Sequence, residues 1–197
     1  FAIFISAKMS GTYSSAHLVK NMILEDYKDA SIEIFDSSTN SMQMGFIALE
    51  AAKAAMSGKT MEEVMKVAES VKENSRFLFV PDTLKYLQKG GRIGKVAGTV
   101  GEFLNLKPII TVADDGAYRT YAKARGSKQA VSKLINIFKS YEGKGNYRVW
   151  VLDGNGKDKV KILCDGIKEL PHCKECIFAG TIAPSLGINT GPGLVRS

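Results

Sequence analysis

Ser10 and Thr12 are the side chains of this sequence whose type and spacing best suit the binding of a small anion. They belong to the segment Ser10-Gly11-Thr12-Tyr13, which follows the apolar run Phe1–Ser6 and precedes a helical pattern. A helix that begins there presents unpaired backbone N–H groups and the positive end of its dipole. With two hydroxyls and a glycine that lets a ligand approach, the segment indicates a site for phosphate, sulfate or carboxylate. The alternative is that the two hydroxyls only cap the helix.

The three cysteines are the next candidates for chemistry, and they form at most half of a metal site. Cys173 and Cys176 have the C-x-x-C spacing, and either His172 or Cys164 would have to join them to complete a zinc site. The pair precedes a strand-like run and does not open a helix, as a thioredoxin-type motif would. We therefore interpret the cysteines as reduced thiols where a loop enters a strand, and we expect no metal site.

Composition and charge exclude some classes of protein. Hydrophobic residues make up 45% of the chain and charged residues 24%, as in ordinary globular proteins. No apolar run is long enough to span a bilayer and no leader peptide is visible, so we expect a cytoplasmic protein. The net charge of +7 comes from Lys and Arg spread along the chain. Because a dense basic stripe with aromatics is missing, the charge favours acidic partners or anionic lipid surfaces and argues against nucleic acid.

The first half of the chain alternates strand and helix signals, which is typical of a parallel sheet flanked by helices. Thr60 and Glu63 have the spacing of a capping box at the start of one helix. The predicted elements are strands at 1–6, 32–36 and 76–80, and helices at 11–27 and 42–56, with another helix opening at Thr60. Repeated right-handed crossovers of this kind predict a three-layer α/β/α domain with a parallel sheet.

The pattern changes near residue 105. Two β-prone runs surround the turn Asp114-Asp115-Gly116 and predict a hairpin over 107–123. Helices at 127–141 and 157–170 and strands at 147–152 and 176–181 complete the predicted elements. We therefore expect a large α/β domain at 1–104 and a smaller two-layer α/β domain with a mixed sheet at 105–197.

Several short segments, taken in order, resemble one protein family. They are Ser10-Gly11-Thr12-Tyr13 with Ala16, Asp36-Ser37, Leu84–Leu87, Lys89-Gly90-Gly91-Arg92-Ile93-Gly94, Leu104-Asn105-Leu106-Lys107-Pro108-Ile109, Asp115-Gly116, Lys123–Arg125 and Gly191-Pro192-Gly193. The set resembles the DegV family of bacterial fatty-acid-binding proteins, and the match covers essentially the whole chain. The resemblance implies the two-domain fold just described, with one long-chain fatty acid held between the domains.

The resemblance also implies a role without catalysis. Members of the family present the carboxylate of the bound fatty acid to a separate kinase subunit, which phosphorylates it. The expected ligand is therefore a long-chain fatty acid, with no further cofactor. The expected partners are the kinase subunit and, transiently, a membrane surface.

For the site, the resemblance implies that Ser10 contacts the carboxylate, with the amides of Gly11 and Thr12 beside it. Asn189 stands where family members often have a histidine before the Gly-Pro-Gly. An asparagine can donate a hydrogen bond but carries no positive charge, so we expect a weaker or differently selective head-group site. Apolar residues that could line a channel for the lipid tail are Phe103-Leu104, Ile109-Ile110 and the Met42–Met56 helix. Ordinary core packing is the alternative for each of them.

Gly90-Gly91-Arg92 has two interpretations. The glycines could cradle a phosphate with Arg92 as its bidentate partner. The structural interpretation, which we favour for the glycines, is a helix that ends at Gly90 and a turn after it. Arg92, Arg125 and Thr190 remain possible ligand or partner contacts.

Two other functions compete with the carrier. The first is an enzyme that acts on a phosphorylated or carboxylated metabolite with Ser10 as nucleophile. Against it, His17 lies two helical turns from Ser10, too far to act as its base. Asp36 could act as a base, but a single carboxylate does not make a catalytic site. The second is a truncated remnant that binds nothing. Family members carry a further segment of very roughly 80 residues, the size of a small domain, before the point where this sequence begins. That segment supplies strands of the large domain and a second hydroxyl for the carboxylate.

Overall fold

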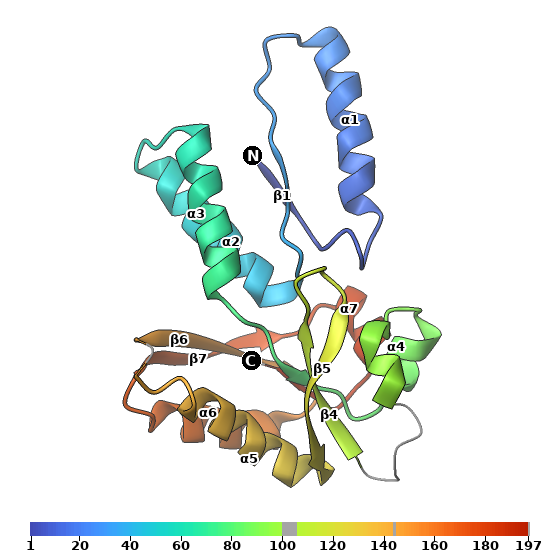
Figure 1. The fold of residues 1–197 in the computed structure, drawn as a ribbon, viewed down its shortest axis with the longest axis vertical. Helices are drawn as coiled ribbons and strands as arrows, with labels where there is room; N and C mark the ends of the chain where they lie inside the picture. The colour runs from blue at the N-terminus through green and yellow to red at the C-terminus, as the bar shows by residue number, and fades with distance from the viewer. Residues whose placement is uncertain (100–105, 144, 197) are drawn as a thin grey trace. The chain divides into compact units, whose positions relative to one another are not determined.

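The computed structural model describes residues 1–99, 106–143 and 145–196 (Figure 1). The chain folds into two compact units. Unit 1 comprises Phe1–Arg76 and Val112–Ala117, and unit 2 comprises Phe77–Thr111 and Tyr118–Ser197. The division into domains at 1–104 and 105–197 stays a prediction, because its boundary lies among residues 100–105, outside the described part.

Unit 1 contains a short parallel sheet with three helices. Strands β1 (Ala2–Phe4) and β2 (Ile34–Asp36) pair in parallel, with Ile3 opposite Phe35. This confirms the predicted parallel pairing. The helices of this unit are α1 (Thr12–Asp26), α2 (Ser41–Met56) and α3 (Met61–Asn74).

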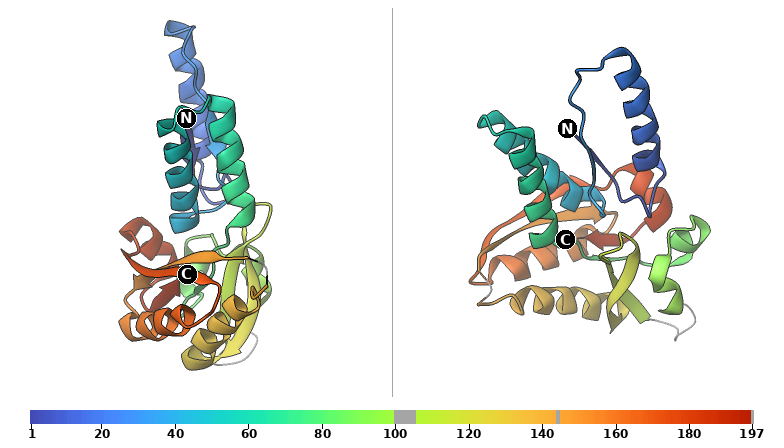
Figure 2. Two further views of the ribbon diagram at one scale, coloured as in Figure 1. Left: turned by 90° about the vertical axis from the view of Figure 1, so that its left-hand side faces the viewer. Right: turned by 45° about the horizontal axis from the view of Figure 1, so that its top comes forward.

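Helices α2 and α3 lie side by side and form the core of unit 1 (Figure 2). Their buried residues, together with Phe35 of β2, are Ile47, Ala51, Ala54, Val64 and Ala68. The predicted capping box at the start of α3 is confirmed: the Thr60 hydroxyl accepts from the Glu63 amide, and the Glu63 carboxylate accepts from the Thr60 amide. Small alanines where the helices meet let the two backbones approach closely.

Helix α1 has no buried residue. Leu18 and Met22 lie four residues apart on one face and are 67% and 65% exposed, and Val19 and Ile23 are exposed beside them. Residues three and four apart share a helix face, so these side chains form one apolar strip.

Unit 2 is built on a mixed sheet. Its strands are β3 (Phe79–Val80), β4 (Leu106–Val112), β5 (Tyr118–Arg125), β6 (Tyr147–Gly154), β7 (Cys173–Thr181) and β8 (Leu194–Arg196), in the order β5-β4-β3-β8-β6-β7. Its helices are α4 (Lys85–Lys89), the 3₁₀ helix η1 (Gly94–Thr99), α5 (Gly126–Lys139), α6 (Lys157–Lys168) and α7 (Pro184–Thr190). Strands β4 and β5 form the predicted hairpin, and β6 and β7 are parallel. The mixed α/β class is as predicted.

Strand β3 differs from the prediction. The run at 76–80 was expected in a parallel sheet with β1 and β2, but β3 pairs antiparallel with β4 and β8 in unit 2. The physical reason is that a strand buried on both faces has no polar side, so its pattern does not indicate its neighbours. The partner strand β8 was not predicted at all.

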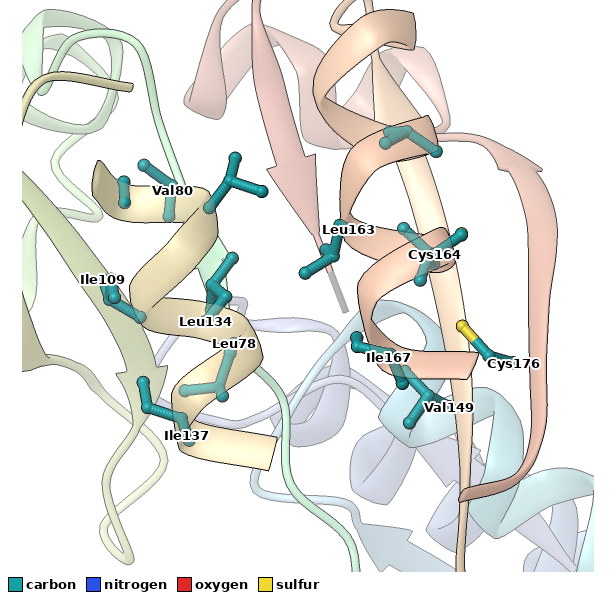
Figure 3. Packing of buried hydrophobic residues seen from close by; sticks show 14 of the residues in the cluster. Leu78, Val80, Ile109, Leu134, Ile137, Val149, Leu163, Cys164, Ile167 and Cys176 are labelled. Carbon is teal, nitrogen blue, oxygen red and sulfur yellow. The ribbon is translucent and has the colours of Figure 1, made fainter. Parts of the chain in front are cut away.

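Helices α5 and α6 cover one face of this sheet and build the main core of unit 2. Leu134 of α5 and Leu163 and Ile167 of α6 are fully buried. Figure 3 shows them near Leu78 of the Phe77–Val80 segment and Val149 of β6. On the opposite face, Phe79 packs against Phe77 and Tyr118.

Candidate functional site

The loop between β1 and α1 is one tight turn centred on Ser6. The backbone carbonyl of Ser6 accepts from the amides of Met9 (2.9 Å) and Ser10 (3.1 Å). The Ser6 hydroxyl accepts from the Lys8 amide at 3.2 Å. Met9 is buried and its sulfur accepts from the side chain of Asn40, so the middle of the loop is anchored inward. The loop therefore carries Ser10 in a defined position.

Ser10 and Thr12 meet at the start of α1. The Ser10 hydroxyl accepts from the Thr12 amide at 3.3 Å and from the Thr12 hydroxyl at 3.1 Å. Ser10 thus satisfies one of the first amides of the helix, as the capping interpretation requires. Among the described residues, no hydrogen bond uses the backbone N–H groups of Gly11, Tyr13 and Ser14. The helix start consequently retains several donors for an anion.

The space beside Gly11 is open. Apart from Gly11 itself and its two chain neighbours, no described heavy atom lies within 4 Å of the position that a Cβ on Gly11 would take. The first turn of α1 contains no acidic residue. Geometry and charge at this helix start are both compatible with a bound carboxylate.

The loop between β2 and α2 supports the same edge of the sheet. A carboxylate oxygen of Asp36 accepts from the Ser38 amide at 2.8 Å, and both oxygens lie 3.4 Å from the Ala7 amide. Thr39 is buried, and its carbonyl accepts from the Ser6 amide at 2.8 Å. Since Asp36 is engaged with backbone amides of both loops, it acts here as a structural acceptor.

The tip of the β4–β5 hairpin contacts Ser6 within unit 1. The Ser6 hydroxyl donates to the Gly116 carbonyl at 2.8 Å. Gly116 has a φ of +82°, and a Cβ on it would overlap the Ser6 hydroxyl. Only glycine therefore suits this turn, both for its backbone conformation and for the space available.

In unit 2, Gly90 and Gly91 form the end of helix α4. The amide of Gly91 donates to the Gln88 carbonyl at 3.0 Å, and the amide of Arg92 donates to the Leu87 carbonyl at 3.0 Å. These two bonds define a Schellman motif, in which Gly91 takes its φ of +68°. The structural interpretation of the glycine pair is thereby supported. The Arg92 guanidinium folds back and donates to the Gly90 carbonyl.

Asn189 lies against this helix end. Its side-chain oxygen occupies the space where a Cβ of Gly90 would be, and its amide donates weakly to the Ser185 carbonyl at 3.4 Å. The neighbouring Thr190 is buried and donates its hydroxyl to the Leu186 carbonyl at 3.0 Å. The structure therefore brings Asn189, Gly90 and Arg92 together, while the Thr190 hydroxyl is already used within α7.

The remaining predicted residues divide into surface and core. Arg125 is exposed at the start of α5, and its guanidinium has no partner within the described residues. Ile109 and Ile110 are fully buried on opposite sides of β4, and Ile47 is buried in α2. The segment Phe103-Leu104 lies outside the described residues. Core packing accounts for the buried residues without a ligand.

The three thiols are free. Cys164 of α6 and Cys176 of β7 are buried in the apolar core of unit 2 (Figure 3). Cys173 is partly buried and packs against this core. Burial raises the pKa of all three thiols, that of Cys176 to about 12, so they stay protonated. Within the described ranges, no three His, Cys, Asp or Glu side chains converge on a possible metal position.

His17 does not activate Ser10. The His17 ring packs edge-on against the Tyr13 ring, with 4.7 Å between the ring centroids. Within the described residues, no hydrogen bond joins His17 to Ser10. A nucleophilic serine needs a base within hydrogen-bonding distance. The geometry of this unit gives no support to a hydrolytic role for Ser10.

The comparisons with known proteins identify the family. The model of the DegV family, described as uncharacterised proteins, matches residues 1–195. A DegV domain-containing protein of Clostridium acetobutylicum is 44% identical over 194 residues, which are 98% of this chain and 67% of that protein. This chain belongs to the DegV family. It spans about two-thirds of the length of this relative.

Two similar solved structures are described by their fatty acid binding. A DegV family protein from Thermus thermophilus, described for its fatty acid binding, matches with a TM-score of 0.86 and 28% identity, over 98% of this chain and 67% of that one. The fatty acid kinase B3 protein of Streptococcus pneumoniae, loaded with linoleic acid, matches with a TM-score of 0.83 and 25% identity, over 98% and 68%. The predicted family and fold class are confirmed.

Sequence reasoning missed the supporting residues of the site. Ser6, Thr39 and Asn40 are polar, yet each is at most 2% exposed. Ser38 and Ser41 have φ values of +50° and +53°, which are uncommon for non-glycine residues. The only signal in the sequence was the run of small polar residues at 37–41, directly after a strand.

None of the described helices is long and apolar enough to cross a membrane.

Proposed function

We propose that this chain binds a long-chain fatty acid and holds the carboxylate at the start of α1 through Ser10, Gly11 and Thr12. The observation that carries the proposal is the group of unbonded backbone amides at Gly11, Tyr13 and Ser14 beside open space. A helix start of this kind favours an anion. The fatty acids held by similar DegV structures suggest that this anion is a carboxylate with a long apolar tail.

We further propose that the chain is a carrier without catalytic activity of its own, and that it presents the carboxylate to a separate kinase subunit in the cytoplasm. The support is the likeness to the B3 protein of a fatty acid kinase. We expect no cofactor besides the lipid. The assignment of Asn189 to the head group rests on the family resemblance, and Arg92, Arg125 and Thr190 stay candidate contacts of the lipid or the kinase.

A transient contact with a membrane surface is part of the same proposal. Unit 2 contains 19 Lys and Arg residues and 8 Asp and Glu residues, which gives a net charge of +11. Unit 1 contains 8 Lys and Arg residues and 12 Asp and Glu residues, which gives a net charge of −4. Anionic lipid headgroups attract basic surfaces, by about 1 kcal/mol for each Lys or Arg close to the membrane. The charge of unit 2 therefore supports contact with an anionic bilayer.

The decisive experiment is native mass spectrometry of the longest available form of the chain, followed by extraction of any bound lipid. We expect a co-purified fatty acid, and Ser10→Ala should weaken its binding roughly ten- to a hundredfold, the value of one hydrogen bond to a charged group. Ser15→Ala is the matched control, because Ser15 lies exposed on the same helix. If no lipid binds any form of the protein, the carrier function is wrong. If Ser10→Ala leaves the affinity unchanged, the carboxylate lies elsewhere.

A further inference from the structure

We propose that Ser6 is a positioning residue for the lipid head group, and that it acts by fixing the loop that carries Ser10. This inference rests on the proposed function, since it assigns a role within the same site. Ser6 lies four residues before Ser10 and does not take part in the anion contact assigned above.

Ser6 joins three segments of unit 1 by hydrogen bonds at each of its polar atoms. Its amide donates to Thr39 in the β2–α2 loop, and its hydroxyl donates to Gly116 at the hairpin tip, both at 2.8 Å. Its carbonyl accepts from Met9 and Ser10, and its hydroxyl also accepts from Lys8. The position of the Ser10 backbone is therefore set directly by Ser6.

The Ser6 hydroxyl serves two backbone groups in a place that water does not reach, since Ser6 is only 1% exposed. Without this hydroxyl, the Lys8 amide loses its acceptor and the Gly116 carbonyl its donor, which penalises the present loop conformation. We expect the loop to relax and to carry Ser10 away from the position in which it bonds a carboxylate.

Small displacements of this kind matter because a hydrogen bond to an anion depends steeply on distance and angle. Binding of the apolar tail of the ligand does not depend on the geometry of the Ser10 loop. Ser6 should therefore affect the recognition of the carboxylate selectively, whereas a purely structural serine would affect every ligand alike.

The test compares two ligands of equal chain length, a long-chain fatty acid and the corresponding fatty alcohol, on the longest available chain. Ser6→Ala should weaken binding of the acid about tenfold, since it indirectly costs roughly one hydrogen bond to a charged group, and should leave the alcohol within about twofold. In a Ser10→Ala background, Ser6→Ala should have no further effect on the acid, because both changes remove the same interaction.

Thr111→Val is the matched control. Thr111 is as deeply buried, at 2% exposed, and its hydroxyl likewise donates to a backbone carbonyl, that of Phe77 at 2.7 Å, which belongs to unit 2. It should leave the preference for acid over alcohol unchanged. Ser6→Cys, which keeps the size with a weaker donor, should show a smaller loss than Ser6→Ala and serves if the alanine variant unfolds.

The outcomes separate this inference from the proposed function. A wild-type chain that binds neither ligand overturns both. A wild type that binds the acid, with Ser6→Ala equally tight, overturns the inference alone. The inference is also overturned if Ser6→Ala weakens binding of the acid and the alcohol equally. It is overturned as well if Ser6→Ala weakens binding of the acid by the full factor in the Ser10→Ala background.

Discussion

At the residue scale, Asn189 is the position at which we expect this chain to depart from the family pattern. Its carboxamide oxygen packs at Gly90, and within the described residues its nitrogen makes a single long bond, to the Ser185 carbonyl. An asparagine offers a carboxylate a neutral donor, whereas a protonated histidine offers a charged one. The substitution should therefore alter how binding depends on pH.

We predict that Asn189→His makes fatty-acid binding pH-dependent. Below the ordinary histidine pKa of about 6.5 the imidazolium should tighten binding about fivefold, because a charge-assisted hydrogen bond is about 1 kcal/mol stronger than a neutral one. Well above that pH the gain should vanish. Affinity measured on either side of this pKa tests the prediction, with Asn136→His in α5 as the control. A gain that is equal at both pH values would contradict the assignment of Asn189.

At the element scale, helix α3 shows how local sequence fixes a helix start. The capping box satisfies the Thr60 and Glu63 amides reciprocally. The backbone hydrogen bond from Thr60 is the main cause that lowers the pKa of the Glu63 carboxyl below its ordinary 4.5, with help from the Thr60 side chain and Lys59. Helix α4 shows the same principle at a helix end, where Gly91 closes the Schellman motif.

We predict that Thr60→Ala lowers the free energy of unfolding of the unit that contains α3 by about 1 kcal/mol, a typical value for a lost N-cap. Because the folded-state pKa of Glu63 is depressed, its contribution is present above the ordinary value of 4.5 and is lost as the pH falls through the lower folded value. Alanine at position 60 keeps the backbone amide that bonds Glu63, so the difference between wild type and Thr60→Ala should shrink in acid only by the smaller part that the Thr60 side chain contributes. Denaturant unfolding at neutral and at acidic pH measures it, and Ser70→Ala on the exposed face of α3 serves as control. A difference that does not change with pH would mean that the Thr60 hydroxyl and the Glu63 carboxylate stabilise the cap independently.

At the scale of the whole molecule, the two units differ in surface character. Unit 2 has a core between its sheet and α5 and α6, whereas α1 of unit 1 exposes an apolar strip at Leu18, Val19, Met22 and Ile23. Contiguous exposed apolar surface promotes association. The short sheet of β1 and β2 adds strand edges that invite pairing with another chain.

We predict that the 197-residue chain by itself associates or dissolves poorly. Replacing Leu18 and Met22 with Lys should increase the monomer fraction, because it removes the most exposed part of the strip and adds charge to it. Sedimentation velocity over a range of concentrations measures the effect, with Lys at the exposed polar positions Ser70 and Asn74 of α3 as the control for added charge alone. A wild-type chain that stays monomeric at high concentration would contradict this prediction.

The sequence by itself determined the local elements and the family. Periodic patterns and caps depend on neighbours in the chain, so helices α1, α2, α3, α5 and α6 and the β4–β5 hairpin were predictable to within a few residues. The motif that contains Ser10 was recognisable for the same reason, since the strand, the loop and the helix start follow one another directly. The resemblance then suggested a carboxylate as the ligand, which composition alone did not.

Only the tertiary structure decided which distant segments meet. The buried run at 76–80 has no polar face, so the sequence could not show that β3 pairs with β4 and β8. The role of Ser6 likewise depends on Gly116, which lies 110 residues away. Such contacts are set by packing and by the need to satisfy buried polar groups. Neither of these produces a periodic pattern in the amino-acid sequence.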